Sequence, residues 1–263
     1  MGAAGNSIQV LGKVGQVLDQ LVDEPEMTAA QLAEVLQEPR SSVHRLLNNL
    51  EQLGFVEPGR VRGSYRLGLR LFQLGNVVAS RFDVRHMAMP WMERIHAVTG
   101  ETVFLCVRRG RDAVCIERID GRRVQSLALR IGSALPLHAG AAPRVLLAYA
   151  PPATWDQYLA EAPLERFTDA TPVTAEQLRP LLEQVRASGV AVSNEDVTPG
   201  IAALGVPVFD HRSEVVASIS ISGLVAGILG SDADKLRDML VEAGHEVSRQ
   251  LGHARDLQST AKE

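Results

Sequence analysis

Residues 27–67 have the sequence MTAAQLAEVLQEPRSSVHRLLNNLEQLGFVEPGRVRGSYRL. In unbroken order, this stretch predicts a capped helix, a tight turn, a second helix and a hairpin. Thr28 followed by Gln31 forms a capping box, which predicts a helix over 29–37. Glu38–Pro39 ends this helix, because proline lacks an amide hydrogen and disfavours helical geometry in the residue before it. The order of these elements predicts a helix-turn-helix.

The second helix of this stretch, capped by Ser41 or Ser42, has apolar residues at three- and four-residue intervals, which predicts one buried face. That face holds Val43, Leu46, Leu47, Leu50 and Leu53. The opposite face carries donors, acceptors and positive charge but no carboxylate, and it suits the major groove of DNA, which accepts one α-helix. We therefore predict DNA contacts by Arg40, Ser41, Ser42, His44, Arg45, Asn48 and Asn49.

A β-hairpin is expected after the second helix. Strands are predicted over 55–57 and 64–67, with turn chemistry at Pro58–Gly59. Between residues 40 and 70, six arginines stand against two glutamates, a local balance of +4 in a chain of net charge −4. This concentration of charge predicts a wing that contacts DNA through Arg60 and Arg62.

The same two helices and hairpin are also compatible with a packed subdomain that contacts another protein. Each arginine taken alone is more typical of a solvated face than of a base contact. The prediction of DNA binding therefore depends on the joint pattern of helix-turn-helix, basic edge and wing.

The composition sets the outer bounds. With 263 residues and 46% hydrophobic side chains, the chain can bury two modest cores. No apolar run approaches the roughly 18–20 residues of a membrane span, and the start lacks a signal peptide, so we expect a cytoplasmic protein without membrane association. Cys106 and Cys115 make neither a zinc cluster nor a disulfide framework, and we expect no metal and no cofactor.

Two further helices are expected around the stretch 27–67. Apolar residues at helical spacing over 7–22 predict a helix on which the helix-turn-helix packs. A helix over 67–81 is richer in apolar side chains than a solvated linker needs. We predict that it joins two domains and contributes to a dimer interface.

The remaining chain mixes strands and helices, which predicts an α+β domain. Helices are expected over 84–98, 139–149, 174–188 (opened by a Thr174–Gln177 capping box) and 231–251, and strands over 102–107, 113–119, 124–130, 202–209 and 214–222. If Gly110–Arg111 is a two-residue hairpin tip, the thiols of Cys106 and Cys115 face each other. A redox switch is compatible with this pairing, although two reduced cysteines are the ordinary state in a reducing compartment.

An enzyme is the rival class. The sequence has no Gly-x-Ser-x-Gly elbow, no phosphate-binding loop, no Gly-x-Gly-x-x-Gly and no His-Glu-x-x-His. His138 is either a general base for Ser220 or Ser222, or a hydrogen-bonded structural histidine, which is commoner at a strand-to-helix junction. We expect no catalytic residue; the alternative is an enzyme or small-molecule-binding module whose N-terminal domain contacts proteins.

Taken together, these segments resemble the IclR family of transcriptional regulators. The resemblance lies in AQLAE (30–34), SSVHRLL (41–47), GFV (54–56), YRLG (65–68), GET (100–102), LPLHA (135–139), PG (199–200), PVFD (207–210) and ISISG (219–223). It implies an α+β chain with a winged helix-turn-helix DNA-binding domain over 7–68, a linker helix, a GAF-like α/β effector-binding domain and a flexible tail. Within this scheme the helix-turn-helix spans about 30–49, the wing 55–67, the linker helix 69–82, the effector-binding domain 83–252 and the tail 253–263.

A small-molecule pocket is expected in the C-terminal domain. Ser220 and Ser222, two residues apart on a strand, must point to the same face, and the backbone amides of a helix start near Ala141 would suit a carboxylate. The resemblance implies a small effector, often an organic acid. The predicted effector contacts are Val124, Leu127, Ala141, Ala142, Ser193, Asn194, Ala203, Ser220 and Ser222.

The sequence departs from the family pattern at this pocket. Ser193–Asn194 stands where an acidic pair is common, Ala203 where cysteine is frequent, and Pro143–Arg144 where Gly-Lys is usual. A less polar cavity is expected; the alternative is that neighbouring strands satisfy the serines and no cavity exists. The resemblance implies a ligand-responsive regulator, most often a repressor, with a double-stranded DNA operator, a small-molecule effector, and a homodimer or tetramer.

Overall fold

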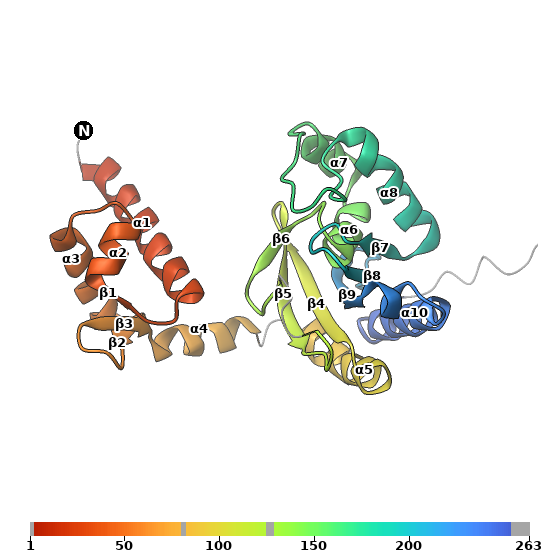
Figure 1. The fold of residues 1–263 in the computed structure, drawn as a ribbon, viewed down its shortest axis with the longest axis horizontal. Helices are drawn as coiled ribbons and strands as arrows, with labels where there is room; N and C mark the ends of the chain where they lie inside the picture. Colours follow the sequence, from red (N-terminus) through yellow and green to blue (C-terminus); the bar gives the residue numbers. More distant parts are fainter. Residues whose placement is uncertain (1–2, 80–82, 125–128, 254–263) are drawn as a thin grey trace, which may run out of the picture. The chain divides into compact units, whose positions relative to one another are not determined.

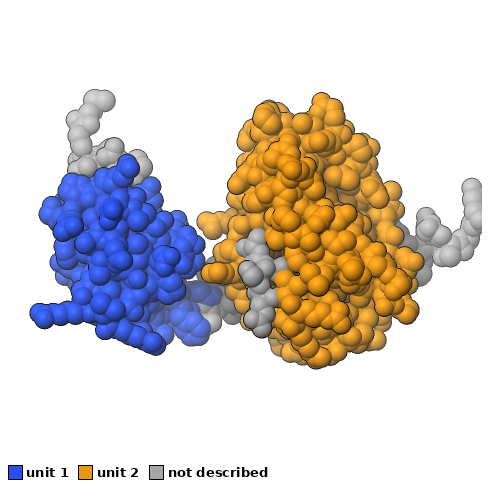
Figure 2. Space-filling model, in the orientation of Figure 1, with its two compact units in different colours: residues 1–81 blue, residues 82–263 orange. Residues whose placement is uncertain are grey.

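The computed structural model describes residues 3–79, 83–124 and 129–253, and the chain divides into two compact units, 1–81 and 82–263 (Figures 1 and 2). The first unit contains α1 (Ala3–Asp23), β1 (Met27–Thr28), α2 (Ala29–Val35), α3 (Arg40–Gln52), β2 (Val56–Pro58), β3 (Ser64–Leu67) and α4 (Leu69–Ala79). Its three-stranded antiparallel sheet has the order β1-β3-β2. The fold of this unit is a winged helix-turn-helix.

The two helices of this motif begin differently. At α2 the predicted capping box is confirmed, because Thr28 Oγ1 accepts from the Gln31 amide at 3.3 Å and Gln31 Oε1 accepts from the Thr28 amide at 2.8 Å. The predicted serine cap of α3 is wrong. Pro39 is the N-cap residue and makes no side-chain capping bond, so α3 already begins at Arg40. The fixed φ of proline near −57° is compatible with a helix start.

The first unit has its own apolar core. Val17 and Leu21 of α1 pack with Leu32 of α2 and with Leu47 of α3, and all four side chains are buried. Leu53, predicted on the buried face, is 60% exposed; it is the C-cap residue directly after the end of α3 at Gln52. The shorter core still buries the face opposite the basic edge of α3.

The second unit is built on one antiparallel six-stranded sheet with the order β6-β5-β4-β9-β8-β7. Its elements are α5 (Asp83–Thr99), β4 (Thr102–Arg109), β5 (Asp112–Ile119), β6 (Ala134–Pro136), α6 (Ala141–Ala148), α7 (Pro152–Leu159), α8 (Ala175–Ser188), β7 (Ala191–Asn194), β8 (Ile201–Phe209), β9 (Val215–Leu224), α9 (Val225–Ile228) and α10 (Ala233–Gln250). Within the described residues, no helix is long and apolar enough to cross a membrane.

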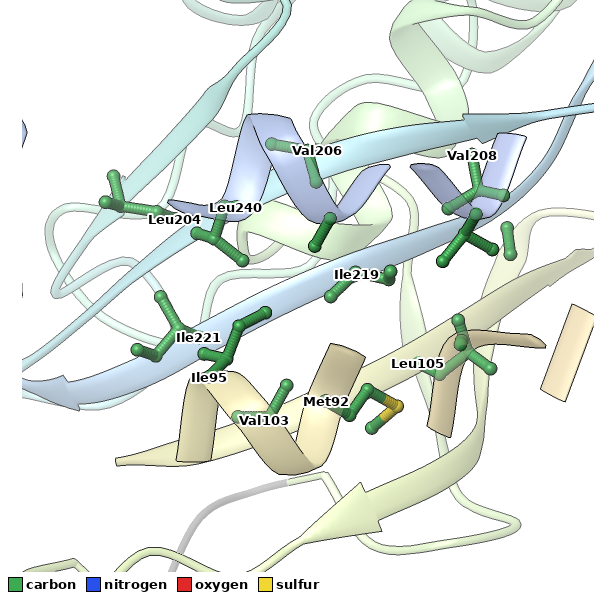
Figure 3. Close-up of a cluster of buried hydrophobic side chains, with 14 of the residues drawn as sticks. Met92, Ile95, Val103, Leu105, Leu204, Val206, Val208, Ile219, Ile221 and Leu240 are labelled. Atoms are coloured by element: carbon green, nitrogen blue, oxygen red, sulfur yellow. The ribbon is translucent and has the colours of Figure 1, made fainter. Parts of the chain in front are cut away.

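Helices cover both faces of this sheet. On one face, Met92 and Ile95 of α5 and Leu240 of α10 pack against alternate strand residues, including Ile219 and Ile221 of β9 (Figure 3). On the other face lies α6, against which α7 and α8 pack. Because side chains alternate along a strand, residues between those of the α5–α10 core face α6. This alternation directs Ser220 and Ser222 towards α6.

The predicted hairpin around Gly110–Arg111 is confirmed. Arg109 pairs with Asp112 on either side of this two-residue turn, and Gly110 has φ +62°. Cys106 lies opposite Cys115 in the register, as predicted, and both thiols are buried and free.

One predicted strand of the second unit is wrong in its described part, and one helix was not predicted. The third strand was expected over 124–130, of which 125–128 lie outside the described residues; Val124, Leu129 and Arg130 are not in a strand. The strand beside β5 is instead β6, with Leu135 opposite Ala113. Helix α7 was not predicted, because Pro151 and Pro152 were interpreted only as the end of α6, whereas proline is also well tolerated in the first helical turn.

Candidate nucleic-acid interface and ligand pocket

The basic edge of α3 is accessible. Arg40, Ser41, His44, Arg45, Asn48 and Asn49 are exposed and Ser42 is half-buried. This exposure follows from the burial of Val43, Leu47 and Leu50 on the opposite face. Arg60 and Arg62 are likewise exposed, in the loop between β2 and β3. The structure thus presents the side chains predicted to contact DNA, and the contacts themselves stay a prediction.

A carboxylate outside the predicted site holds the wing. Oε1 of Glu26 accepts hydrogen bonds from the amide of Val61 at 2.6 Å and from the hydroxyl of Ser64 at 2.5 Å. The bond from Ser64, followed by that from Val61, lowers the pKa of Glu26 below its ordinary value. Glu26 was missed in the sequence because a single carboxylate before a helix cap carries no recognisable pattern.

A pocket lies between the sheet and the start of α6. The cavity has a volume of about 60 Å³ and is partly open to solvent. Six residues predicted to contact the effector line it: Ala141, Ala142, Ser193, Ala203, Ser220 and Ser222. The structure therefore has a pocket at these residues, while the Ser222 hydroxyl is satisfied by the neighbouring strand, as the alternative without a cavity expected.

Two other predicted pocket residues do not line this space. Asn194 is exposed at the end of β7, where alternation turns it away from Ser193, and Val124 is also absent from the lining. Leu127 lies outside the described residues. Nine further residues line the pocket in the described part of the chain and were not among the predicted contacts: Phe104, Leu129, Leu135, Gly140, Pro143, Val197, Thr198, Ile201 and Ala202. Alternation from Val103 and Leu105 was a signal that could have identified Phe104.

The strand register arranges the polar lining in two rows. Ser193, Ala203 and Ser222 are direct partners across β7, β8 and β9. In the neighbouring row, Gly205 pairs with Ser220 and lies against the start of α6, where a Cβ atom at 205 would be 3.1 Å from the Ala142 nitrogen. The glycine thus permits the first turn of α6 to approach the sheet closely.

A buried ion pair lies next to the pocket and contacts two of its lining residues. Arg144 of α6 pairs with Asp196, and the two side chains are 3% and 4% exposed. The Asp196 carboxylate also accepts from the hydroxyl of Ser193 and from the amide of Gly140, the latter at 3.4 Å. Because the arginine charge is neutralised by Asp196 and neither residue belongs to the lining, the described lining contains no charged side chain.

His138 is a structural histidine. Its Nδ1 lies 2.9 Å from the Tyr158 hydroxyl and its Nε2 lies 2.8 Å from the Glu165 carbonyl oxygen. Burial lowers the pKa of His138, and burial raises the pKa of Tyr158 to about 12. His138 does not belong to the pocket lining, so the arrangement does not make it a base for Ser220 or Ser222.

No candidate metal site is present in the part of the chain that the structure describes. Within residues 3–79, 83–124 and 129–253, no group of three or more His, Cys, Asp or Glu side chains is placed to hold a metal ion.

A winged helix-turn-helix with an accessible basic edge, followed by an α/β unit with an internal pocket, defines a ligand-responsive transcriptional regulator. Comparison with known proteins gives the family. Residues 10–59 match the IclR helix-turn-helix domain, and residues 76–249 match the bacterial transcriptional regulator IclR C-terminal domain. The chain belongs to the IclR family, as the resemblance in the sequence predicted.

Full-length relatives agree with this assignment. The HTH-type transcriptional regulator XynR of Escherichia coli (strain K12) is 32% identical, covering 94% of this chain and 98% of XynR. KipR of Bacillus subtilis (strain 168) is 31% identical, covering 94% and 99%.

Solved structures share the fold. The IclR of Thermotoga maritima matches with a TM-score of 0.77 at 31% identity, covering 94% of this chain and all of that chain. An IclR homologue of Microbacterium hydrocarbonoxydans, crystallised in complex with 4-hydroxybenzoate, matches with a TM-score of 0.81 at 27% identity, covering 92% and 98%. The predicted fold class, a helix-turn-helix domain followed by an α/β domain, is confirmed.

Proposed function

We propose that this regulator is a cytoplasmic repressor without catalytic activity, in which a homodimer presents two winged domains to two operator half-sites. The observation that carries this proposal is the exposed edge of α3 over 40–49, which has arginine and asparagine, next to a wing with two exposed arginines. Glu51 is also exposed, two turns after His44 on the same side of α3, so the carboxylate-free part of this edge ends at Asn49. Arginine and asparagine recognise base edges in the major groove, while wing arginines meet phosphate. The proposed DNA-binding domain is 7–68, joined by the helix over 69–82 to the effector-binding domain over 83–252.

The proposed effector is a small organic acid that binds in the pocket of the second unit. The uncharged lining combines apolar walls with the Ser220 hydroxyl and the amides at the start of α6, which suit a carboxylate. The Microbacterium homologue was crystallised with 4-hydroxybenzoate, which is a small organic acid. Effector binding changes DNA affinity only if the two conformations of the regulator bind the acid with different affinity.

The proposed dimer interface involves α4 and α1. Leu69 and Phe72 of α4 are each 64% exposed, and Leu11 of α1 is 69% exposed. Apolar side chains of this size, exposed on neighbouring turns, are typical of a protein–protein contact. A second copy of the chain is the proposed partner.

The test of DNA recognition compares Arg45→Ala with Arg62→Ala. Arg45→Ala should weaken binding to the specific operator by about 1–3 kcal/mol if the side chain reads a base, whereas Arg62→Ala should chiefly reduce the salt dependence if it meets phosphate. An operator is first selected from a random duplex library with the wild-type chain. Gel-shift titrations at several salt concentrations then separate the two effects.

Arg212→Ala is the matched control, because this exposed arginine lies in the turn before β9, within the second unit. Its binding curves should overlay those of the wild type. Unchanged binding in both Arg45→Ala and Arg62→Ala would show that the recognition surface has been misassigned.

A further inference from the structure

Two serine hydroxyls in the pocket have already donated their only proton within the protein. Ser222 Oγ donates to the carbonyl oxygen of Ala202 at 3.0 Å, and Ser193 Oγ donates to the carboxylate of Asp196. A carbonyl oxygen and an ionised carboxylate can only accept, so the direction of both bonds is fixed. Towards a ligand, these two hydroxyls therefore offer lone pairs and no proton.

These acceptors lie in one row of the sheet. Ser193 and Ser222 flank Ala203, which is their direct partner on β8, and all three residues line the pocket. The methyl group of Ala203 leaves the space between the two hydroxyls free of a polar side chain. The row is thus a patch that accepts hydrogen bonds on both sides of a small apolar centre.

Donors lie in the neighbouring row. The first amides of a helix have no intrahelical partner, and within the described residues the Ala141 and Ala142 amides have no backbone partner. Ser220 is 3% exposed and lines the pocket beside them, and no partner for its hydroxyl is found in the described part of the chain. Pro143 contributes no amide hydrogen to this turn. These donors lie at the end of the pocket at Gly205, which lies against this turn, and Thr198 in the segment between β7 and β8 adds one further hydroxyl to the lining.

The geometry points to an effector that is a compact hydroxy acid, with its carboxylate at the start of α6 and a hydroxyl that donates to Ser193 and Ser222. The two rows are two residues apart along the strands, which separates them by about 6–7 Å. An acid without the hydroxyl leaves the row of acceptors buried against an apolar group, which costs binding energy. This inference rests on the proposed role of the pocket as the effector site.

The experiment compares pairs of acids that differ by one hydroxyl. Benzoate is paired with 4-hydroxybenzoate, and hexanoate with 6-hydroxyhexanoate, so that the hydroxyl is remote from the carboxylate in both pairs. Dissociation constants are obtained from thermal-shift titrations of the full chain, because a ligand stabilises the form it binds. At least one hydroxy acid should bind about tenfold more tightly than its parent, which corresponds to about 1.4 kcal/mol. In 2-hydroxybenzoate the hydroxyl lies beside the carboxylate, so this isomer should gain nothing over benzoate.

Serine variants test which hydroxyls are responsible. Ser222→Ala and Ser193→Ala should bring the hydroxy acid and its parent to near-equal affinity. Ser218→Ala is the matched control, because Ser218 lies on the same strand and donates to the Val206 carbonyl at 3.0 Å, but it does not line the pocket. It removes a bond of the same kind and should preserve the preference for the hydroxy acid.

The outcomes separate this inference from the proposed function. Equal binding of parent and hydroxy acids to the wild type overturns the accepting row and leaves the acid-binding pocket intact. A preference that survives in both Ser222→Ala and Ser193→Ala, or that is lost equally in Ser218→Ala, also overturns it. If no acid of either pair binds, the organic-acid effector fails with it, whereas DNA recognition is judged separately by the gel-shift series.

Discussion

Among single residues, Glu26 brings a carboxylate against the wing, which belongs to the most basic stretch of the chain. Its carboxylate joins the segment before α2 to the wing, through the Val61 amide and the Ser64 hydroxyl. The wing loop between these two residues carries Arg62, so the carboxylate fixes the base of a loop proposed to contact phosphate. We therefore expect Glu26 to affect DNA binding by positioning the wing rather than by contacting DNA.

Glu26→Gln should lower the melting temperature at neutral pH and weaken DNA binding. Because hydrogen bonds lower the pKa of Glu26 in the folded state, its stabilisation is complete above the ordinary value of 4.5 and is lost as pH falls through the folded-state pKa. The difference in melting temperature between wild type and Glu26→Gln should therefore shrink below about pH 4.5. Melting curves between pH 3 and 7 measure this. Glu24→Gln, a change at an exposed neighbour, should show no such difference, and a difference independent of pH would contradict an ionised Glu26.

At the scale of elements, the Arg144–Asp196 pair ties α6 to the segment between β7 and β8. Asp196→Asn leaves the arginine charge buried without its counter-charge, which should lower the free energy of unfolding by about 3–5 kcal/mol. Both tryptophans, Trp91 and Trp155, belong to the second unit, so urea unfolding followed by tryptophan fluorescence reports on this unit.

Two further variants define the interpretation of that result. Asp156→Asn breaks an exposed ion pair with Arg179 and should cost only about 0–1 kcal/mol. The double variant Arg144→Met with Asp196→Leu removes both charges and should be more stable than Asp196→Asn alone. Equal losses in Asp196→Asn and Asp156→Asn would show that the buried pair contributes no more than a surface pair.

The elements also show what the sequence could predict. Both capping boxes are present, at Thr28 and at Thr174, because a cap and its partner three residues later are local interactions. Register was predictable where it followed from a two-residue turn, as in the Cys106–Cys115 pair. β6 was misplaced because a three-residue edge strand is specified by its neighbour and by the turn at Gly132, not by its own pattern.

The pocket was predictable only in part, for the same reason. Ser220 and Ser222 followed from strand alternation, and Ser193 and Ala203 followed from the family resemblance. Asp196 was missed because its partners, Arg144 and Gly140, lie more than 50 residues away in sequence, and such a pairing depends on the sheet order. Ser193 donates its proton to the same carboxylate, three residues away in sequence.

At the scale of the whole molecule, the proposed mechanism requires two DNA-binding domains in one assembly. A single winged unit binds one half-site, and two linked units bind a paired site more tightly because the second contact is intramolecular. The exposed Leu69 and Phe72 of α4 belong to the same unit as the basic edge of α3. A dimer formed through this helix would therefore bring two DNA-binding domains together directly.

Leu69→Asp combined with Phe72→Asp should convert the dimer to a monomer, because two charges then replace apolar contacts at the proposed interface. Loss of central apolar anchors of this kind typically costs 2 kcal/mol or more, so the dimer dissociation constant should rise by about 30-fold or more. Sedimentation at micromolar concentration measures the assembly, and gel shifts compare an operator of two half-sites with a single half-site. The variant should lose affinity for the paired operator and keep its affinity for the half-site.

Val98→Asp, at a site 66% exposed on α5, is the control and should remain a dimer. A wild-type chain that sediments as a monomer would contradict the proposed assembly, and a variant that remains dimeric would place the interface elsewhere.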